Sequence, residues 1–164
     1  MASGLRLVDK IKPVTGLDSV VPSTSTPDYV ALKLYKHLTA IILVKNATTV
    51  TGSAITLKQA TAVAGTSEKA LAFTTYWSNI DTGAGDTLSE ATASSNTFTT
   101  DATNSKNLMY VLEVDADDLD IDNGFDCVRV GTGNATAATV TVLYILSQPR
   151  YSGSVGDLPS AIID

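Results

Sequence analysis

The chain of 164 residues is long enough for one domain built around a single hydrophobic core. Charged residues make up only 17% of it, and its net charge of −6 would repel nucleic-acid phosphates and anionic membranes. The composition therefore argues against a nucleic-acid partner and against a membrane partner.

The one cysteine, Cys127, excludes an internal disulfide framework and a cysteine-rich zinc site. The N-terminal residues lack the apolar core of a signal peptide, and the longest apolar run, residues 40–44, is far shorter than a membrane span. We therefore expect a protein that folds in the cytoplasm.

Residues 1–27 are predicted to form an extended N-terminal arm. Pro13, Pro22 and Pro27 fix the backbone and keep the preceding residues out of helices, so this segment can be ordered only by lying along another surface. That surface is either the protein's own domain or a neighbouring subunit with which the arm is exchanged.

From residue 28 to residue 149, short β-prone runs alternate with turns rich in Gly, Ser, Asn and Asp. This pattern predicts an all-β domain, a single antiparallel β-sandwich of roughly eight strands. The predicted strands are residues 29–35, 38–46, 53–63, 69–77, 96–101, 107–115, 124–132 and 138–148. The second of them, "LTAIILVKN", is a nearly continuous apolar run of the kind found in strands buried on both faces.

Residues 150–164 are predicted to form a C-terminal tail. The segment is rich in turn-forming residues and closes on Ile162 and Ile163 before a terminal aspartate. Apolar residues at an otherwise loose terminus indicate docking onto a surface, and the domain's own surface is one candidate.

His37 and Cys127 are the candidates for acid–base or nucleophilic chemistry. His37 is the only histidine, so it has no second imidazole with which to hold a transition metal. Cys127 lies on a β-prone run, on the same face as Phe125 or in register with Arg129, where a small buried thiol is expected. No phosphate loop, nucleophile elbow or zinc-protease motif occurs. We therefore assign no catalytic, cofactor-binding or metal-binding residue, and we predict no cofactor and no enzymatic activity.

Trp77 could belong to a stacking platform for a sugar or a base. The aromatic residues considered with it are Phe73, Tyr76 and Tyr110. Because aromatic residues make up only 6% of the chain, a sandwich core needs most of them, and core packing is favoured. Glu90 and Glu113 stand in unrelated segments, so they do not predict the paired carboxylates of a glycosidase.

The decapeptide "DADDLDIDNG", residues 115–124, is the stretch that most resembles a metal site. A calcium loop starting at Asp118 has Asn123 where glycine is required and Arg129 where the bidentate glutamate belongs. A start at Asp115 fits less well still. An adventitious surface cation remains an alternative, but the residues favour a structural connector.

As a connector, the decapeptide is predicted to form a capped helical turn. Asp115 would cap the turn, the aspartates after it would lie at its positive end, and Leu119 and Ile121 would point inward. Asn123 and Gly124 would then reverse the chain and deliver it to the core. No histidine or lysine partner is expected for these carboxylates.

Several segments together resemble a family of small virion proteins of tailed bacteriophages that are encoded among the head genes. The resemblance covers almost the whole chain and lies in "DYVALK", "LKQATAVAGTSEKAL", "YWSNIDTGAGDTL", "VLEVDADDLDIDNGFDCVRVGTG", "YILSQPRY" and "PSAIID". It implies a jelly-roll β-sandwich and a capsid decoration or cement protein. Because these motifs are structural, the resemblance carries over no catalytic or binding residue.

The resemblance also sets expectations for partners and location. The partners would be the major capsid protein and neighbouring copies of this chain, in a homo-oligomer that we expect to be a trimer, with a dimer as the alternative. The location would be the capsid surface of the virion, after folding in the host cytoplasm. Two alternatives remain open, namely another virion part such as a head-completion, tail or fibre-base subunit, and a host-surface or carbohydrate-binding module.

Overall fold

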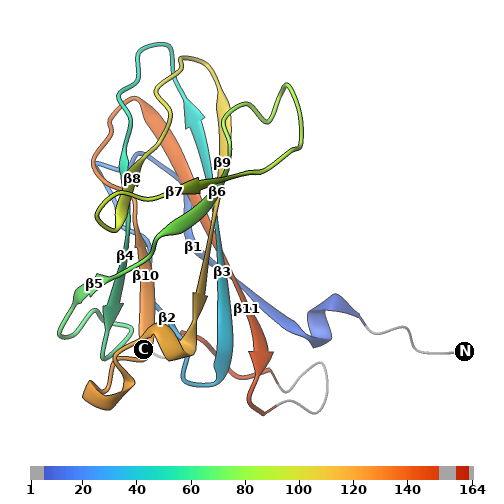
Figure 1. Cartoon of the computed structure of the whole chain (residues 1–164), viewed down its shortest axis with the longest axis vertical. Helices are drawn as coiled ribbons and strands as arrows, with labels where there is room; N and C mark the ends of the chain where they lie inside the picture. Colours follow the sequence, from blue (N-terminus) through green and yellow to red (C-terminus); the bar gives the residue numbers. More distant parts are fainter. Residues whose placement is uncertain (1–5, 152–157, 163–164) are drawn as a thin grey trace, which may run out of the picture.

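Two antiparallel sheets form the fold in the computed structural model, which describes residues 6–151 and 158–162 (Figure 1). The six-stranded sheet has the order β1 (Ile11–Val20), β11 (Ala138–Pro149), β3 (Tyr35–Asn46), β9 (Asn107–Asp115), β6 (Thr75–Asn79) and β7 (Ser89–Thr92). The five-stranded sheet has the order β2 (Val30–Ala31), β10 (Cys127–Gly131), β4 (Ala54–Ala60) and β5 (Lys69–Leu71), and β8 (Thr97–Thr99) also pairs with β4. The remaining elements are the short 3₁₀ turns η1 (Leu7–Asp9), η2 (Ala116–Asp118) and η3 (Ile121–Asn123).

The strand pairing is nested, with the first strand against the last. β1 pairs with β11, β2 with β10, β3 with β9, and β4 with β5 and β8. This nesting is the topology of a jelly roll, and the β6–β7 hairpin extends the first sheet beyond β9. The predicted all-β sandwich of the jelly-roll kind is confirmed. Among the described residues, no helix has the length and apolar character needed to cross a membrane.

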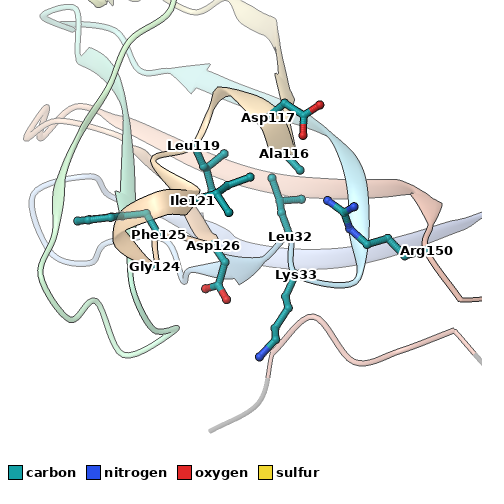
Figure 2. A pocket seen from close by; sticks show the side chains of 10 residues that line it. All are labelled: Leu32, Lys33, Ala116, Asp117, Leu119, Ile121, Gly124, Phe125, Asp126 and Arg150. Atoms are coloured by element: carbon teal, nitrogen blue, oxygen red, sulfur yellow. The ribbon is translucent and has the colours of Figure 1, made fainter.

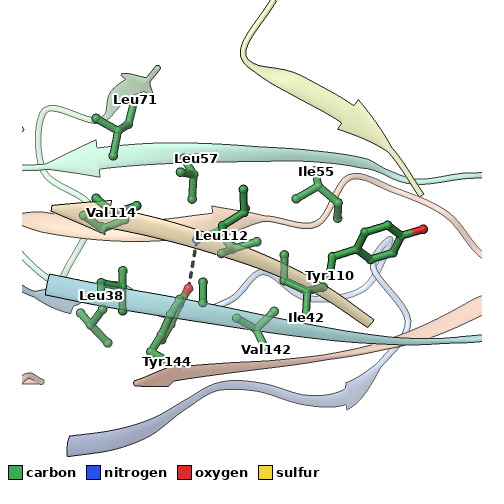
Figure 3. Close-up of a cluster of buried hydrophobic side chains, with 14 of the residues drawn as sticks. Leu38, Ile42, Ile55, Leu57, Leu71, Tyr110, Leu112, Val114, Val142 and Tyr144 are labelled. Carbon is green, nitrogen blue, oxygen red and sulfur yellow. Dashed lines mark hydrogen bonds between the residues drawn. The ribbon is translucent and has the colours of Figure 1, made fainter. Parts of the chain in front are cut away.

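The core lies between the sheets because every second residue of the long strands points inward (Figure 3). Leu38 and Ile42 of β3 and Leu112 of β9 are fully buried there. An aromatic cluster fills one part of this core, where the rings of Tyr76 and Phe98 stack with their centroids 3.9 Å apart. The cluster also contains Phe73 and Tyr110.

Of the two surfaces considered for the predicted N-terminal arm, the structure shows the protein's own domain, because residues 11–20 pair with β11 and form the edge strand β1 of the sandwich. Two shifts of register interrupt its pairing with β11, which explains why its sequence lacks a regular alternation. Pro13 is tolerated because β1 lies at the sheet edge. The predicted boundary at residue 28 therefore comes too late, and residues 1–5 lie outside the described part.

The C-terminal tail docks onto both sheets, at β2 and at the start of β3. The backbone N–H of Ala31 donates to the carbonyl of Ala161 at 2.8 Å, and the Tyr35 hydroxyl donates to the carbonyl of Pro159. Ala161 is only 1% exposed, whereas Ile162 is 36% exposed. The tail thus docks onto its own domain, which was the surface considered for it, and the residue that it buries there is Ala161. Residues 152–157, 163 and 164 lie outside the described residues.

Candidate functional site

The six-stranded sheet turns one face to the core and the other away from it, and we call the second the outer face. On β3, β9 and β11 its side chains alternate with fully buried ones. Its apolar members, all half-buried or exposed, are Ile11, Pro13, Ile41, Leu43, Trp77, Met109, Val111, Leu143 and Ile145. The middle of the outer face is therefore apolar although nothing in the described chain packs over it as a second layer.

One row of residues crosses the outer face from strand to strand in register. It runs Thr15, Leu143, Ile41, Val111, Trp77, Glu90. Directly opposed residues of neighbouring strands have their Cβ atoms about 4.5–5.5 Å apart, so the four central side chains of the row form one continuous strip. Contiguous apolar strips of this kind on a protein surface mark interaction sites.

Two predictions fail on this face. The run 38–46 was expected to be buried on both faces, but Leu43 is 40% exposed. Trp77 was expected in the core, but its neighbour Tyr76 takes that position and Trp77 is half-buried on the outer face. Both errors have the same cause, since the sequence shows that these residues are apolar without showing whether a second layer covers them.

One end of the outer face carries an acidic group around a histidine. The His37 ring contacts Asp115 through Nδ1 at 2.7 Å and Glu113 through Nε2 at 2.5 Å. Thr39 donates a further hydrogen bond to Glu113 at 2.9 Å. Burial lowers the pKa of His37, but the hydrogen bonds from its ring to Asp115 and Glu113 outweigh this effect and raise the pKa above its ordinary value. Local sequence patterns do not reveal this contact, because 76 residues separate His37 from Glu113 along the chain.

The opposite end of the outer face is basic and polar. Lys45 of β3 is exposed there and pairs in register with Asn107 of β9 and Thr139 of β11. The outer face thus has an apolar middle, a carboxylate-rich end around His37 and a lysine at the other end.

The decapeptide forms the predicted connector between β9 and β10. Asp115 caps η2, and its backbone N–H donates to the carboxylate of Asp118 at 3.0 Å. Gly124 follows η3 in the left-handed conformation, with φ of 81°, which glycine adopts at little cost. Phe125 and Cys127 are delivered to buried positions, as predicted.

Three details of the decapeptide differ from prediction. Ile121 points outward and is 52% exposed. Asp115 has a histidine partner in His37, and Asp120 has a lysine partner in Lys69. Among the described residues, no group of three His, Cys, Asp or Glu side chains is arranged to hold a metal ion.

A hollow of about 490 Å³ lies beside the connector (Figure 2). Its apolar lining includes Leu32, Leu119 and Ile121, and charged side chains including Lys33 and Arg150 stand around it. The lining also includes Asp117 and Asp126, so the hollow combines apolar side chains with charged ones of both signs.

A charged network connects the strands of the five-stranded sheet. Glu68 accepts hydrogen bonds from the hydroxyl of Tyr29 at 2.6 Å and from the guanidinium of Arg129 at 2.5 Å, and it also pairs with Lys58. The hydrogen bond from Lys58, followed by that from Tyr29, lowers the pKa of Glu68. This network holds the sheet surface together and favours the ionised form of Glu68.

Cys127 lies nearby in a small buried cluster with Tyr29 and Ala60. Burial raises the pKa of its thiol to about 12, and contact with Asp126 acts in the same direction. The thiol is therefore protonated at neutral pH and is a poor nucleophile.

Comparison with known proteins gives one solved structure. The crystal structure of the SPBc2 prophage-derived protein YomS is similar with a TM-score of 0.45 and 15% sequence identity, over 84% of this chain and 93% of that chain. No family model matches the sequence. No curated protein matches it either.

Proposed function

We propose that this protein is a structural protein of a tailed-phage virion that binds the outside of the capsid shell as a decoration or cement protein. In this role it stabilises contacts between major capsid subunits, and its partners are those subunits and copies of itself. It folds in the host cytoplasm and resides on the capsid surface. The sequence segments that resemble phage head proteins support this role, as does the jelly-roll fold.

The observation that carries the proposal is the apolar outer face. A cement protein acts through contact area, and it needs broad complementary surfaces rather than a pocket with convergent polar groups. The exposed Leu43 and the half-buried Trp77 lie on such a surface. A non-enzymatic role also agrees with the two candidate reactive groups, because the Cys127 thiol is buried and both ring nitrogens of His37 are engaged.

Trp77 supports a second candidate, a carbohydrate-binding module. It lines a cleft of about 300 Å³ together with Glu113 and Asp118, and an indole beside carboxylates can stack on and hydrogen-bond to a sugar. No second aromatic side chain extends the strip on the outer face within the described residues, which makes this candidate weaker. A glycan array separates the two, since the decoration role predicts no bound glycan.

The test of the decoration role is binding to shells that lack the protein. Purified protein is mixed with such shells, and the bound fraction is measured by co-sedimentation at increasing concentration. Saturation near one copy per major capsid subunit, or one per capsid threefold trimer, is the expected result, together with a higher temperature of shell disruption. Saturation at a handful of copies per particle contradicts decoration and favours the head-completion, tail or fibre-base alternative.

A further inference from the structure

We infer that the outer face is the contact surface for a second copy of this chain, related by a twofold axis that runs along the row from Thr15 to Trp77. The inference deepens the proposed function, on which it rests for its biological setting, because it names which proposed partner occupies this face. The two sheets would pack face to face, as the sheets of a sandwich do.

The first argument is the composition of the central strands. In the middle of β3 and β11 the outward residues are apolar as well as the inward ones, with Ile41 and Leu43 outward on one strand and Leu143 and Ile145 outward on the other. The outward residues towards the strand ends are polar, namely His37, Thr39, Lys45, Thr139, Thr141 and Ser147. Sheets with one solvated face instead alternate apolar and polar side chains. The middle of these two strands therefore has the pattern of a sheet that is covered on both sides.

The second argument is the size of the face. Five strands about 4.8 Å apart, with the run 37–45 rising roughly 3.4 Å per residue, give a face of about 24 by 27 Å. Two such faces would together bury about 1,300 Å², which falls within the range of about 1,200–2,000 Å² for specific interfaces. The face is thus large enough for a stable dimer without further surfaces.

The third argument is the distribution of charge, which selects the axis. Ile41 lies midway between His37 and Lys45 on β3, so a twofold axis across the strands at Ile41 places the end with Asp115 of one copy beside Lys45 of the other. An axis parallel to the strands would instead place the two carboxylate-rich ends against each other, whereas the axis along the row brings only one carboxylate near its counterpart, that of Glu90, an exposed residue at the margin of the face. Like charges in contact are costly, so the arrangement across the strands is favoured.

The position of Trp77 makes this contact measurable. It is the only tryptophan of the chain and lies at the end of the apolar strip in register with Val111. In the proposed dimer, Trp77 lies at the twofold axis close to its counterpart in the second copy. Its fluorescence therefore reports on the outer face alone.

The experiment combines sedimentation equilibrium with tryptophan emission on the full-length chain over a range of concentrations. The expected result is a monomer–dimer equilibrium, with a blue shift of emission that follows the same concentration dependence. K45E is expected to weaken the dimer by roughly tenfold or more, because it places two repulsive contacts in one symmetric interface. The double variant K45E/D115K restores opposite charges and is expected to recover most of the affinity.

Two further variants complete the design. K33E makes the same charge change at an exposed lysine beside the hollow, away from the outer face, and should leave the dimer intact. I41T keeps a β-branched residue in the centre of the strip and should weaken the dimer; its folding is checked by circular dichroism. K45E tests the inference independently if I41T fails to fold.

The inference is overturned by a protein that stays monomeric at high micromolar concentration, by a trimer, or by a dimer that K45E and K33E affect equally. Shell binding in the absence of dimers also overturns it, while leaving the decoration role intact. A dimer that behaves as expected but binds no shell contradicts the decoration role alone.

Discussion

Tyr144 and Val130 join the two sheets across the core by a hydrogen bond, in which the backbone N–H of Val130 donates to the Tyr144 hydroxyl at 3.0 Å. The same hydroxyl donates to the carbonyl of Asp28 at 3.1 Å. Tyr144 belongs to β11 and Val130 to β10, and both are fully buried. Figure 3 shows the ring reaching across the sandwich and the first of these bonds as a dashed line. A buried phenol therefore fixes the position of one sheet against the other.

The substitution Tyr144→Phe should reduce the free energy of unfolding by about 1–3 kcal/mol, because it leaves a buried N–H and a carbonyl without their partner. Urea unfolding followed by circular dichroism measures the change. Tyr151→Phe is the matched control, since Tyr151 is 73% exposed and should tolerate the loss of its hydroxyl. Equal stability of Y144F and the natural protein would show that the cross-sheet bond has no net effect.

Gly16 of β1 provides a second test of the same region. A Cβ atom at this position would lie 2.3 Å from the ring of Tyr144, which is too close for any real contact and too rigidly placed to move away. Gly16→Ala should therefore destabilise the protein by about 1–3 kcal/mol through overpacking. Gly85→Ala serves as the control, because nothing lies within 4 Å of the added atom. A G16A variant as stable as G85A would indicate that β1 can shift away from the ring.

The local sequence predicted the central strands well, because their residues either alternate between apolar and polar or form a continuous apolar run. The run 107–115 was predicted with the same bounds as β9, and the run 138–148 differs from β11 by one residue. The run 69–77 was predicted as one strand but divides into β5 and β6, which lie in different sheets. β1 and β7 were missed, because edge strands can carry proline, glycine and charge that local patterns attribute to loops.

The surface was less predictable than the core. The apolar residues of the outer face can be read from the sequence. A hydrophobicity pattern does not distinguish a strand whose outer side is covered by the same chain from one whose outer side is covered by a partner. Contacts such as the one between His37 and Asp115 depend on the register of β3 against β9, which local sequence does not reveal. Local sequence therefore predicts neither the register between strands nor the assembly of the protein with a partner.

His37 should make stability depend on pH. Its pKa is raised in the folded protein above the ordinary value of 6.5, chiefly because hydrogen bonds to Asp115 and Glu113 outweigh its burial. The folded state therefore binds the proton more tightly than the unfolded state, and the added stability is fully present below about pH 6.5. It is lost as the pH rises through the folded-state pKa.

The measurement is urea unfolding at pH values from slightly acidic to slightly alkaline. The free energy of unfolding should fall over this window in the natural protein, and His37→Gln should flatten the slope. Asp115→Asn, which keeps the histidine but removes one carboxylate, should flatten it partly. A slope that persists unchanged in H37Q would assign the effect to another group.

The last prediction concerns metal removal. In the connector, the Asp115 carboxylate contacts His37, and the carboxylate of Asp118 accepts from the backbone of Asp115. The carboxylate of Asp120 pairs with Lys69 and accepts from the side chain of Asn123 at 2.8 and 2.9 Å. These contacts, with that of Lys69 first, lower the pKa of Asp120 and keep it ionised. Three of the connector's carboxylates, those of Asp115, Asp118 and Asp120, are thus already engaged by donors of the protein.

A chelator should therefore leave the thermal midpoint of unfolding unchanged, and added calcium should not raise it. Asp118→Asn and Asp122→Asn distinguish a capped turn from a cation site, because of these two residues it is Asp118 whose carboxylate accepts from the backbone N–H of Asp115, the N-cap residue of η2. For a capped turn, D118N lowers the midpoint slightly and D122N, at an exposed position, leaves it unchanged. For a cation site, both variants would lower the midpoint, and calcium would raise that of the natural protein in a manner that the chelator reverses.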